Sequence, residues 1–384
     1  MITVKDIKTD ITNTSSIKAK REALINATNP DKLPTTYQVN ETAHKLHPNI
    51  IKAVVKDIVK ATDNIKIITF KAENAFPPFK AGTFVTLSLK MHNQVITRPY
   101  SIYSSIKEAN NGILKLGIQS AGILSNYVNN ELKVGTPVLI SEPSGDFYHD
   151  DIRDSNHILA LAGGSGVTPF VSMMKSIQEG SEDFSITLLY GVKSKKDLMF
   201  NINEFNDPRI EIIPILSNEE VANYEHGFIN ANIIKKYLKK DSSIFVCGPD
   251  VMYQFVKEEL KKLNIDLNKV RFEHNCAKDL KITNPNVYTL TVHMRGEIYK
   301  IKAQENETLL IAMEKANLLV PSRCRSGLCG FCHSRLIKGS YKAPKEYEHR
   351  RLADYKFNYI HPCSTYPTSD IEIDVPPFDE LKEL

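Results

Sequence analysis

The distribution of cysteines constrains this chain more than any other feature of its sequence. Four of the six cysteines fall between residues 324 and 363, and the first three of these are spaced C-x4-C-x2-C. The chain begins MITVKDIKTD, which lacks the apolar run of a secretory leader, so we expect a cytoplasmic protein with reduced thiols. Clustered cysteines in that compartment more often bind metals or carry redox chemistry than form disulfides.

The spacing of the clustered cysteines favours an iron–sulfur cluster over a zinc ion. Zinc sites commonly pair their cysteines as two C-x2-C knuckles, whereas C-x4-C-x2-C followed by a distant cysteine is typical of plant-type [2Fe–2S] centres. Within the segment CRSGLCGFC, Gly327 and Gly330 allow the backbone to wrap closely around a cluster. The alternatives are a zinc knuckle or four buried cysteines. The predicted cluster ligands are Cys324, Cys329, Cys332 and Cys363.

The overall composition is that of a globular protein with more than one domain. At about 150 residues per domain, 384 residues predict two to three domains. The chain is 42% hydrophobic and 24% charged, which supports a packed core and excludes a disordered or fibrous chain. No apolar run approaches the roughly 20 residues that span a bilayer. A net charge of +4 is too small to indicate nucleic-acid binding, so we predict no membrane and no nucleic acid among the partners.

Residues 157–175 have the pattern of a strand, a glycine-rich turn and a helix. They read HILALAGGSGVTPFVSMMK, with Gly163, Gly164 and Gly166 ahead of a helix that carries Pro169 in its first turn. The free amides and the dipole at such a helix start favour a phosphate group. By itself a glycine-rich turn of this kind is about as often purely structural.

Further apolar runs extend this pattern into a doubly wound α/β sheet. Strands are expected at 184–191 and 210–217, and another precedes Cys247-Gly248-Pro249. Ligands of such sheets bind beyond the carboxyl ends of the strands, so the glycine-rich turn and the Cys247 turn are predicted to share one site. The alternative interpretation of Cys247 is a small buried core residue.

From about residue 51 to 150 the chain instead predicts an antiparallel barrel. Short alternating strands are separated by Gly, Pro and Asn turns. One strand carries Arg98-Pro99-Tyr100-Ser101, which offers a guanidinium for a phosphate, a flat ring for packing and a hydroxyl for hydrogen bonding. Further along, Gly122 and Ser125 open a short predicted helix whose start is a second candidate anion site.

The order of these motifs resembles the ferredoxin-NADP reductase superfamily with a carboxyl-terminal ferredoxin domain. Examples are the reductase components of bacterial oxygenases, of phenylacetyl-CoA epoxidase and of hybrid cluster protein. The motifs RPYS, GxxS, GGSGVTP, CGPxxM and the cysteine segment occur in that order over residues 51–384. The resemblance implies a β-barrel FAD domain at 51–150, an NAD(P)-binding domain at 151–280 and an α+β plant-type ferredoxin domain of the β-grasp type at 285–384. Residues 1–50 form an extension of unknown role outside the resemblance, with a possible helix in SIKAKREALINA; we favour a packing extension, and a disordered arm or a docking element are the alternatives.

The resemblance also implies roles for individual residues. Arg98 and Tyr100 hold the flavin phosphate and pack on the isoalloxazine, next to Pro99, while Ser101 contacts the reactive N5. Gly122 and Ser125 contact the FAD pyrophosphate. The residues implied at the nicotinamide nucleotide site are Gly163, Gly164, Gly166, Thr168, Cys247, Gly248 and Pro249.

The implied catalytic groups are Ser101, Cys247 and Glu273. Family members usually carry a flavin-shielding aromatic residue two positions after the equivalent of Glu273, where this sequence has Asn275. The expected cofactors are FAD, a [2Fe–2S] cluster and NADPH or NADH as donor.

The function implied by the resemblance is electron transfer to a partner redox protein. Hydride passes from NAD(P)H to FAD, because flavin can accept two electrons and release them singly to a [2Fe–2S] cluster. The acceptor is either an oxygenase component or an anaerobic protein such as hybrid cluster protein. A redox sensor without catalytic turnover and a zinc-binding interaction module are the alternatives.

Charged residues suggest two further features. Residues 191–197, GVKSKKD, lack an early acidic residue for the ribose hydroxyls, which favours NADPH over NADH, although a solvated basic loop is an equal alternative. Between 323 and 356 there are nine Lys or Arg against three acidic residues. We predict a partner with an acidic patch that docks on Lys345, Arg350 and Arg351, whereas counter-charge for the cluster is the alternative. Nothing in the sequence specifies an oligomeric state.

Overall fold

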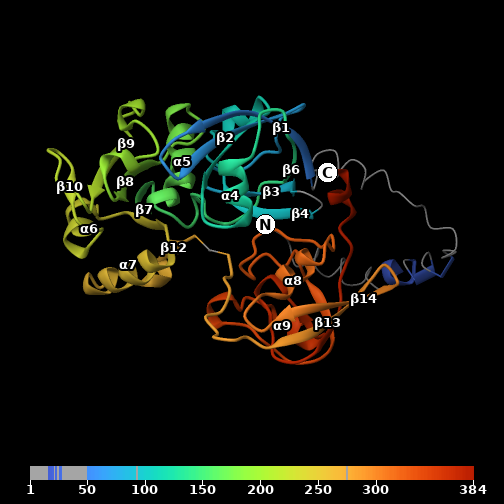
Figure 1. The fold of residues 1–384 in the computed structure, drawn as a ribbon. Helices are drawn as coiled ribbons and strands as arrows, with labels where there is room; N and C mark the ends of the chain where they lie inside the picture. Colours follow the sequence, from blue (N-terminus) through green and yellow to red (C-terminus); the bar gives the residue numbers. More distant parts are fainter. Residues whose placement is uncertain (1–15, 21, 24–25, 28–49, 92–93, 274–275) are drawn as a thin grey trace. The chain divides into compact units, whose positions relative to one another are not determined.

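A computed structural model describes residues 16–20, 22–23, 26–27, 50–91, 94–273 and 276–384 (Figure 1). The chain divides into two units, Met1–His47 and Pro48–Leu384. In the first unit the described residues are helical and exposed, which confirms the expected helix at those positions. Within the described residues no helix is long and apolar enough to cross a bilayer.

The first sheet of the second unit is the predicted antiparallel barrel domain. Its strands are β1 (Ile50–Lys60), β2 (Ile65–Ala72), β3 (Phe84–Met91), β4 (Gln94–Ser101), β5 (Ile113–Gln119) and β6 (Pro137–Ser141). In the described residues they are ordered β4-β3-β6-β1-β2-β5, and a bridge between Ile102 and Leu116 joins the two edges. Alternating residues such as Phe70, Leu87 and Leu114 are fully buried inside, because successive strand residues face opposite sides. The short helices α3 (Ile106–Asn110) and α4 (Ile123–Asn130) follow β4 and β5.

The second sheet is parallel and confirms the doubly wound nucleotide domain. Its strands are β7 (His157–Gly163), β8 (Ser185–Val192), β9 (Ile210–Leu216), β10 (Glu225–His226), β11 (Ser243–Cys247) and β12 (Val270–Phe272). Their order in the described residues is β10-β9-β8-β7-β11-β12. The connecting helices are α5 (Thr168–Gln178), α6 (Ala231–Tyr237) and α7 (Asp250–Lys262). Strands β7 and β11 are neighbours in parallel register, so the turns that follow them meet at one edge.

The third sheet, drawn in orange and red in Figure 1, confirms the α+β ferredoxin domain. Its strands are β13 (Val287–Met294), β14 (Glu297–Gln304), β15 (Ser334–Lys338), β17 (Tyr359–Ile360) and β19 (Ile371–Asp374). A separate two-stranded ribbon joins β16 (Tyr341–Lys342) to β18 (Tyr366–Pro367). Helices α8 (Leu309–Lys315) and α9 (Leu352–Lys356) complete the domain. Leu309, Leu310 and Met313 of α8 are buried in the same apolar cluster as Cys332 and Cys363. Packing in the core of this domain therefore holds these two cysteines in place.

Candidate functional site

The four predicted cluster ligands converge on one point. The segment 324–332, which we call the cluster loop, brings the Cys324 sulfur within hydrogen-bonding reach of the thiols of Cys329 and Cys363, and Cys363 likewise meets Cys332. Gly327 and Gly330 have φ of 78° and 71°, which confirms the predicted need for glycine at these turns. A β-carbon at Gly327 would also lie 2.2 Å from the Tyr347 carbonyl oxygen.

Backbone amides of the cluster loop point at the sulfurs, as a cluster site requires. The Cys324 sulfur accepts from the amides of Ser326 at 3.5 Å and Cys329 at 3.3 Å, and the Cys329 sulfur accepts from Phe331 at 3.4 Å. Hydrogen bonds from neighbouring thiols lower the pKa of Cys324. No three His, Cys, Asp or Glu side chains in the described ranges form a single-ion site. A [2Fe–2S] cluster divides four thiolates between two irons, so this sulfur set fits that cluster.

Ser101, Cys247 and Glu273 are brought together although they are far apart in the sequence. Ser101 ends β4, Cys247 ends β11, and Glu273 directly follows β12. The Ser101 hydroxyl donates to Glu273 Oε1 at 2.6 Å, and the Cys247 thiol donates to Glu273 Oε2 at 2.6 Å. One carboxylate therefore links the end of the predicted flavin motif, Arg98-Pro99-Tyr100-Ser101, to the end of a strand of the parallel sheet.

Burial shifts the pKa values of both Glu273 and Cys247. The pKa of Glu273 is raised by burial, and the two hydrogen bonds that it accepts oppose the shift. Burial and the Glu273 carboxylate raise the pKa of Cys247, which is 4% exposed, so it is a neutral thiol at neutral pH. Tyr253 is a further residue of this site, which the sequence analysis did not identify. Its hydroxyl accepts from the Gly248 amide at 3.3 Å. The one sequence signal for it is its position in the first turn of α7, shortly after the CGP motif.

The glycine-rich turn packs directly on the turn that follows Cys247. A β-carbon at Gly166 would lie 2.4 Å from the Cys247 carbonyl oxygen, and one at Gly163 or Gly248 would lie 2.5 Å from Met252 Sδ. Close packing against backbone therefore requires glycine at Gly166, whereas a side chain at Gly163 or Gly248 would displace the flexible end of Met252. Residues 164–167 form a 3-10 turn that leads into α5 at Thr168, whose hydroxyl donates to the Ser165 carbonyl oxygen at 3.1 Å. Pro249 is the N-cap residue of α7.

The flavin motif on β4 is partly buried. Tyr100 packs against the barrel core, and its pKa is raised by burial. Arg98 is directed toward α8 of the ferredoxin domain, with Nη1 donating to Glu314 Oε2 at 3.1 Å and to the Thr97 carbonyl oxygen at 2.7 Å. Pro99 lies between them in β4, opposite Thr86 of β3. Sequence reasoning did not identify Glu314, because its partner lies in another domain.

The start of α4 carries Gly122 and Ser125, the residues predicted to contact the FAD pyrophosphate. The Ser125 hydroxyl accepts from the amides of Gly122 at 2.8 Å and Ala121 at 3.0 Å, which fixes the turn. Gly122 is exposed with an extended φ of −158°, and a β-carbon there would touch nothing within 4 Å. Packing and backbone conformation do not demand glycine here, so the contact of Gly122 with a ligand phosphate stays a prediction.

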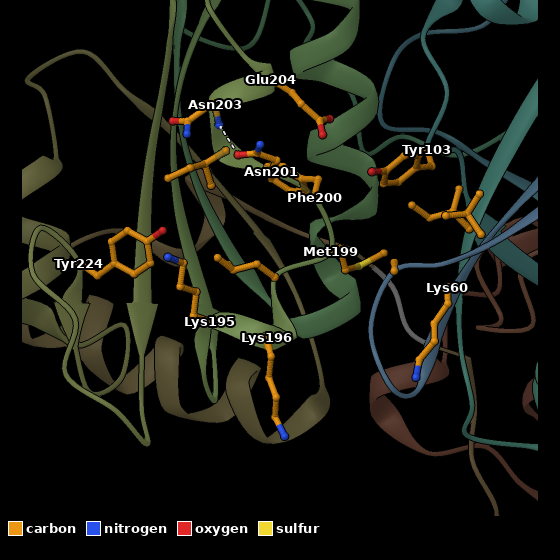
Figure 2. A pocket seen from close by; sticks show the side chains of 15 residues that line it. Lys60, Tyr103, Lys195, Lys196, Met199, Phe200, Asn201, Asn203, Glu204 and Tyr224 are labelled. Carbon is orange, nitrogen blue, oxygen red and sulfur yellow. Dashed lines mark hydrogen bonds between the residues drawn. The ribbon is translucent and has the colours of Figure 1, made fainter.

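The loop after β8 lines a pocket of about 640 Å³ (Figure 2). Figure 2 shows Lys195 and Lys196 extending from this loop in different directions. Ser194, a candidate 2′-phosphate ligand, donates its hydroxyl to Asp197 Oδ2 at 2.7 Å, and the Lys195 amide is bonded to Glu219. Neither Ser101, Cys247 nor Glu273 lines this pocket. Asn275 lies outside the described residues.

The basic residues near the cluster differ in their availability. The Arg350 guanidinium is 8% exposed, donates to both Glu348 oxygens at 2.9 and 2.6 Å, and donates to the Tyr341 hydroxyl at 2.6 Å. Lys345 and Arg351 are exposed. Arg350 is therefore engaged within the domain, unlike the other two predicted docking residues.

Three family models match the chain in succession. They are the oxidoreductase FAD-binding domain at residues 52–149, the oxidoreductase NAD-binding domain at 160–258 and the 2Fe-2S iron-sulfur cluster binding domain at 292–368. Each match corresponds to one of the three sheets.

Whole-length relatives have the same arrangement. The chain is 25% identical to NADH oxidoreductase HCR of Escherichia coli (strain K12), over 83% of this chain and 95% of that protein. It is also 25% identical to the glycine betaine monooxygenase reductase subunit of Chromohalobacter salexigens, over 83% of this chain and 93% of that protein. The solved structure of phthalate dioxygenase reductase covers 85% of this chain and 98% of its own, with a TM-score of 0.63 at 20% identity.

Proposed function

Because the chain belongs to the ferredoxin-NADP reductase superfamily with a carboxyl-terminal [2Fe–2S] domain, we propose that it is the reductase component of a two-protein electron-transfer system. It is an oxidoreductase that carries electrons from NAD(P)H through FAD to the cluster. Its acceptor is a partner redox protein, as the oxygenase reductase names of its relatives indicate.

The contact of Glu273 with both Ser101 and Cys247 carries this proposal. It places the hydroxyl proposed for the flavin N5 and the thiol proposed for the nicotinamide on the same carboxylate. Flavin accepts hydride and releases single electrons, which matches a nucleotide site on one side and a one-electron centre on the other. We propose that Ser101 and Cys247 orient the two rings and that Glu273 fixes both side chains.

A steady-state assay separates this function from that of a redox sensor. The protein loaded with FAD and cluster is mixed with NAD(P)H and a one-electron dye, and the rate of dye reduction is measured. A reductase turns over continuously, whereas a sensor stops after its own centres are reduced. A single stoichiometric burst without turnover, for both NADH and NADPH, would overturn the proposed function.

We propose α9 and its neighbours as the surface that docks the partner. Leu352 is 90% exposed, and Tyr355 and Phe357 are also exposed, with Arg351 and Lys356 beside them in sequence. Asp354 of α9 bonds His333 at 2.7 Å and lies 3.8 Å from His361, whose ring bonds the Gly327 carbonyl oxygen in the cluster loop. This face therefore combines an apolar centre and positive charge close to the cluster, which suits a partner with an acidic patch around an apolar spot.

Ionic strength tests this surface. Charge reversal at Arg351 and Lys356 is expected to slow reduction of the partner and to flatten its salt dependence, because exposed charges are screened over about 10 Å at 0.1 M salt. Lys300→Glu, an exposed change on β14, is the control. Partner reduction that is equally sensitive to salt in the charge-reversed variant and in the wild type would leave the basic residues as counter-charge for the cluster.

Coenzyme choice, compartment and domain limits complete the proposal. Lys195 and Lys196 support a preference for NADPH, and comparing kcat/KM for NADPH and NADH tests it.

Thiolate cluster ligands support the cytoplasm as the compartment. We propose domain limits at 51–150, 151–280 and 285–384, which limited proteolysis would test.

A further inference from the structure

The cluster loop contains a residue in an unusual conformation. Arg325 directly follows the ligand Cys324, is buried and has a φ of 56°, in the left-handed region that residues other than glycine, asparagine and aspartate seldom occupy. Such strained residues persist only where surrounding contacts hold them, so the contacts of Arg325 indicate its role.

The Arg325 side chain leaves its own domain and reaches the strand that carries the flavin motif. Its Nη1 donates to the Thr97 carbonyl oxygen at 3.0 Å, and Thr97 is in β4, directly before Arg98. Its guanidinium also donates two parallel hydrogen bonds to the carboxylate of Glu314 in α8, from Nη1 to Oε1 at 2.7 Å and from Nη2 to Oε2 at 3.0 Å. This paired geometry fixes both the distance and the angle of the two side chains.

Glu314 extends the connection to the flavin motif itself. Its carboxylate also accepts from Arg98 Nη1, so one buried acid lies between an arginine of the cluster loop and the arginine proposed for the flavin phosphate. The two guanidinium charges balance burial of the carboxylate and hold the pKa of Glu314 below its ordinary value. Cys324, Arg325, Glu314 and Arg98 thus form a continuous covalent and hydrogen-bonded path from the cluster to the flavin motif.

Neighbouring contacts make this edge of the ferredoxin domain a specific interface. Phe331 of the cluster loop and Val95 of β4 both pack against the small apolar cluster that includes Leu139 of β6 and Phe378, and the Phe331 and Phe378 rings are 5.4 Å apart. The apolar contacts bury surface but do not fix the position of the cluster loop along β4. A buried ion pair does fix it, because its hydrogen bonds form in one arrangement only.

We propose that Arg325 and Glu314 are positioning residues that hold the cluster loop in one register on β4 and thereby set the rate of electron transfer from flavin to cluster. This inference rests on the proposed function. Electron transfer between two bound centres slows steeply as the distance between them grows, so a shift of the loop has a measurable effect on the rate.

Glu314→Gln tests the proposal, because glutamine retains the shape of the side chain but not the charge that holds two guanidinium groups. Glu307→Gln is the matched control: Glu307 is a buried acid of the same domain, paired with Lys315, without a contact to β4 among the described residues. Arg325→Lys retains the charge and loses the paired hydrogen bonds.

In rapid-mixing experiments on the full chain with both cofactors bound, flavin bleaching by NAD(P)H is expected to match the wild type in Glu307→Gln, and in each variant it is the reference against which cluster reduction is compared. Subsequent cluster reduction is expected to slow severalfold in Glu314→Gln, less in Arg325→Lys and not in Glu307→Gln. The cluster's electron paramagnetic resonance spectrum and midpoint potential are expected to be unchanged, which separates displacement from damage to the cluster. Hydrogen exchange of β4 amides in the cofactor-free chain is expected to rise in Glu314→Gln, less in Arg325→Lys and not in Glu307→Gln.

Cluster reduction and β4 exchange at wild-type levels in Glu314→Gln would overturn the positioning role while leaving the proposed function intact. Loss of flavin bleaching in the wild type would instead overturn the proposed function. A slower rate of cluster reduction together with a changed midpoint potential of the cluster would also overturn the positioning role. The slower rate would then follow from the changed potential and not from a displaced loop.

Discussion

Glu273→Gln is expected to slow flavin reduction by NAD(P)H roughly 10- to 100-fold. In the wild type each carboxylate oxygen accepts one hydrogen bond, from Ser101 and from Cys247, both at 2.6 Å. Glutamine keeps one accepting oxygen and presents an amide N–H₂ to the other donor, so one of the two contacts is lost. A hydrogen bond to a charged group contributes about 1.5–3 kcal/mol, and about 1.4 kcal/mol corresponds to a tenfold change in rate.

The pH dependence provides a second expectation with a defined sign. Burial raises the pKa of Glu273 above its ordinary value of 4.5. Only the ionised carboxylate leaves both oxygens free to accept, so the rate of flavin bleaching is expected to fall as pH falls through this raised pKa. The glutamine variant lacks a titrating group at this position, so this limb of its profile is expected to disappear.

Anaerobic stopped-flow absorbance of the flavin band measures both effects. Glu259→Gln is the control, because Glu259 is a buried acid of the nucleotide domain that pairs with Lys262 and the Ala231 amide. A Glu273→Gln rate within twofold of the wild type at every pH would refute the role assigned to the carboxylate.

Four further predictions concern a cluster ligand, two glycines and the stability of the protein across pH. Cys324→Ser is expected to abolish reduction of one-electron protein acceptors while flavin bleaching by NAD(P)H persists; loss of bleaching in a folded, FAD-loaded variant would contradict the order of electron flow. Gly166→Ala is expected to lower the free energy of unfolding by about 1–3 kcal/mol in a thermal melt, because its β-carbon would meet a carbonyl oxygen at 2.4 Å. Gly122→Ala is expected to lower the melting temperature of the cofactor-free protein slightly, because alanine is a poorer N-cap for α4 than glycine, and to weaken FAD binding in a titration; unaltered affinity would remove Gly122 from the phosphate site. Because the pKa of Glu273 is raised on folding, the wild type is expected to lose stability relative to Glu273→Gln as pH rises from about 4.5 through the raised value, which chemical denaturation across pH would detect.

The sequence by itself determined the motifs whose chemistry depends on short-range spacing. The cysteine pattern predicted the convergence of four ligands, because a cluster loop must bend within a few residues and Gly327 and Gly330 mark those bends. Strand periodicity and the turn after His157–Gly163 likewise predicted the parallel sheet and its ligand edge, because both depend on local backbone geometry.

Only the tertiary structure decided which distant side chains meet. Glu273 lies 172 positions from Ser101 and 26 from Cys247, and no local pattern specifies that one carboxylate bonds both. Arg98 was predicted from its motif, but its contact with Glu314 depends on how two domains pack. Charge counting could not distinguish the engaged Arg350 from the exposed Arg351, because the Glu348 and Tyr341 contacts that bury the former arise from folding. Local spacing thus determined the chemistry of each motif, whereas packing between elements remote in sequence determined how the motifs are connected.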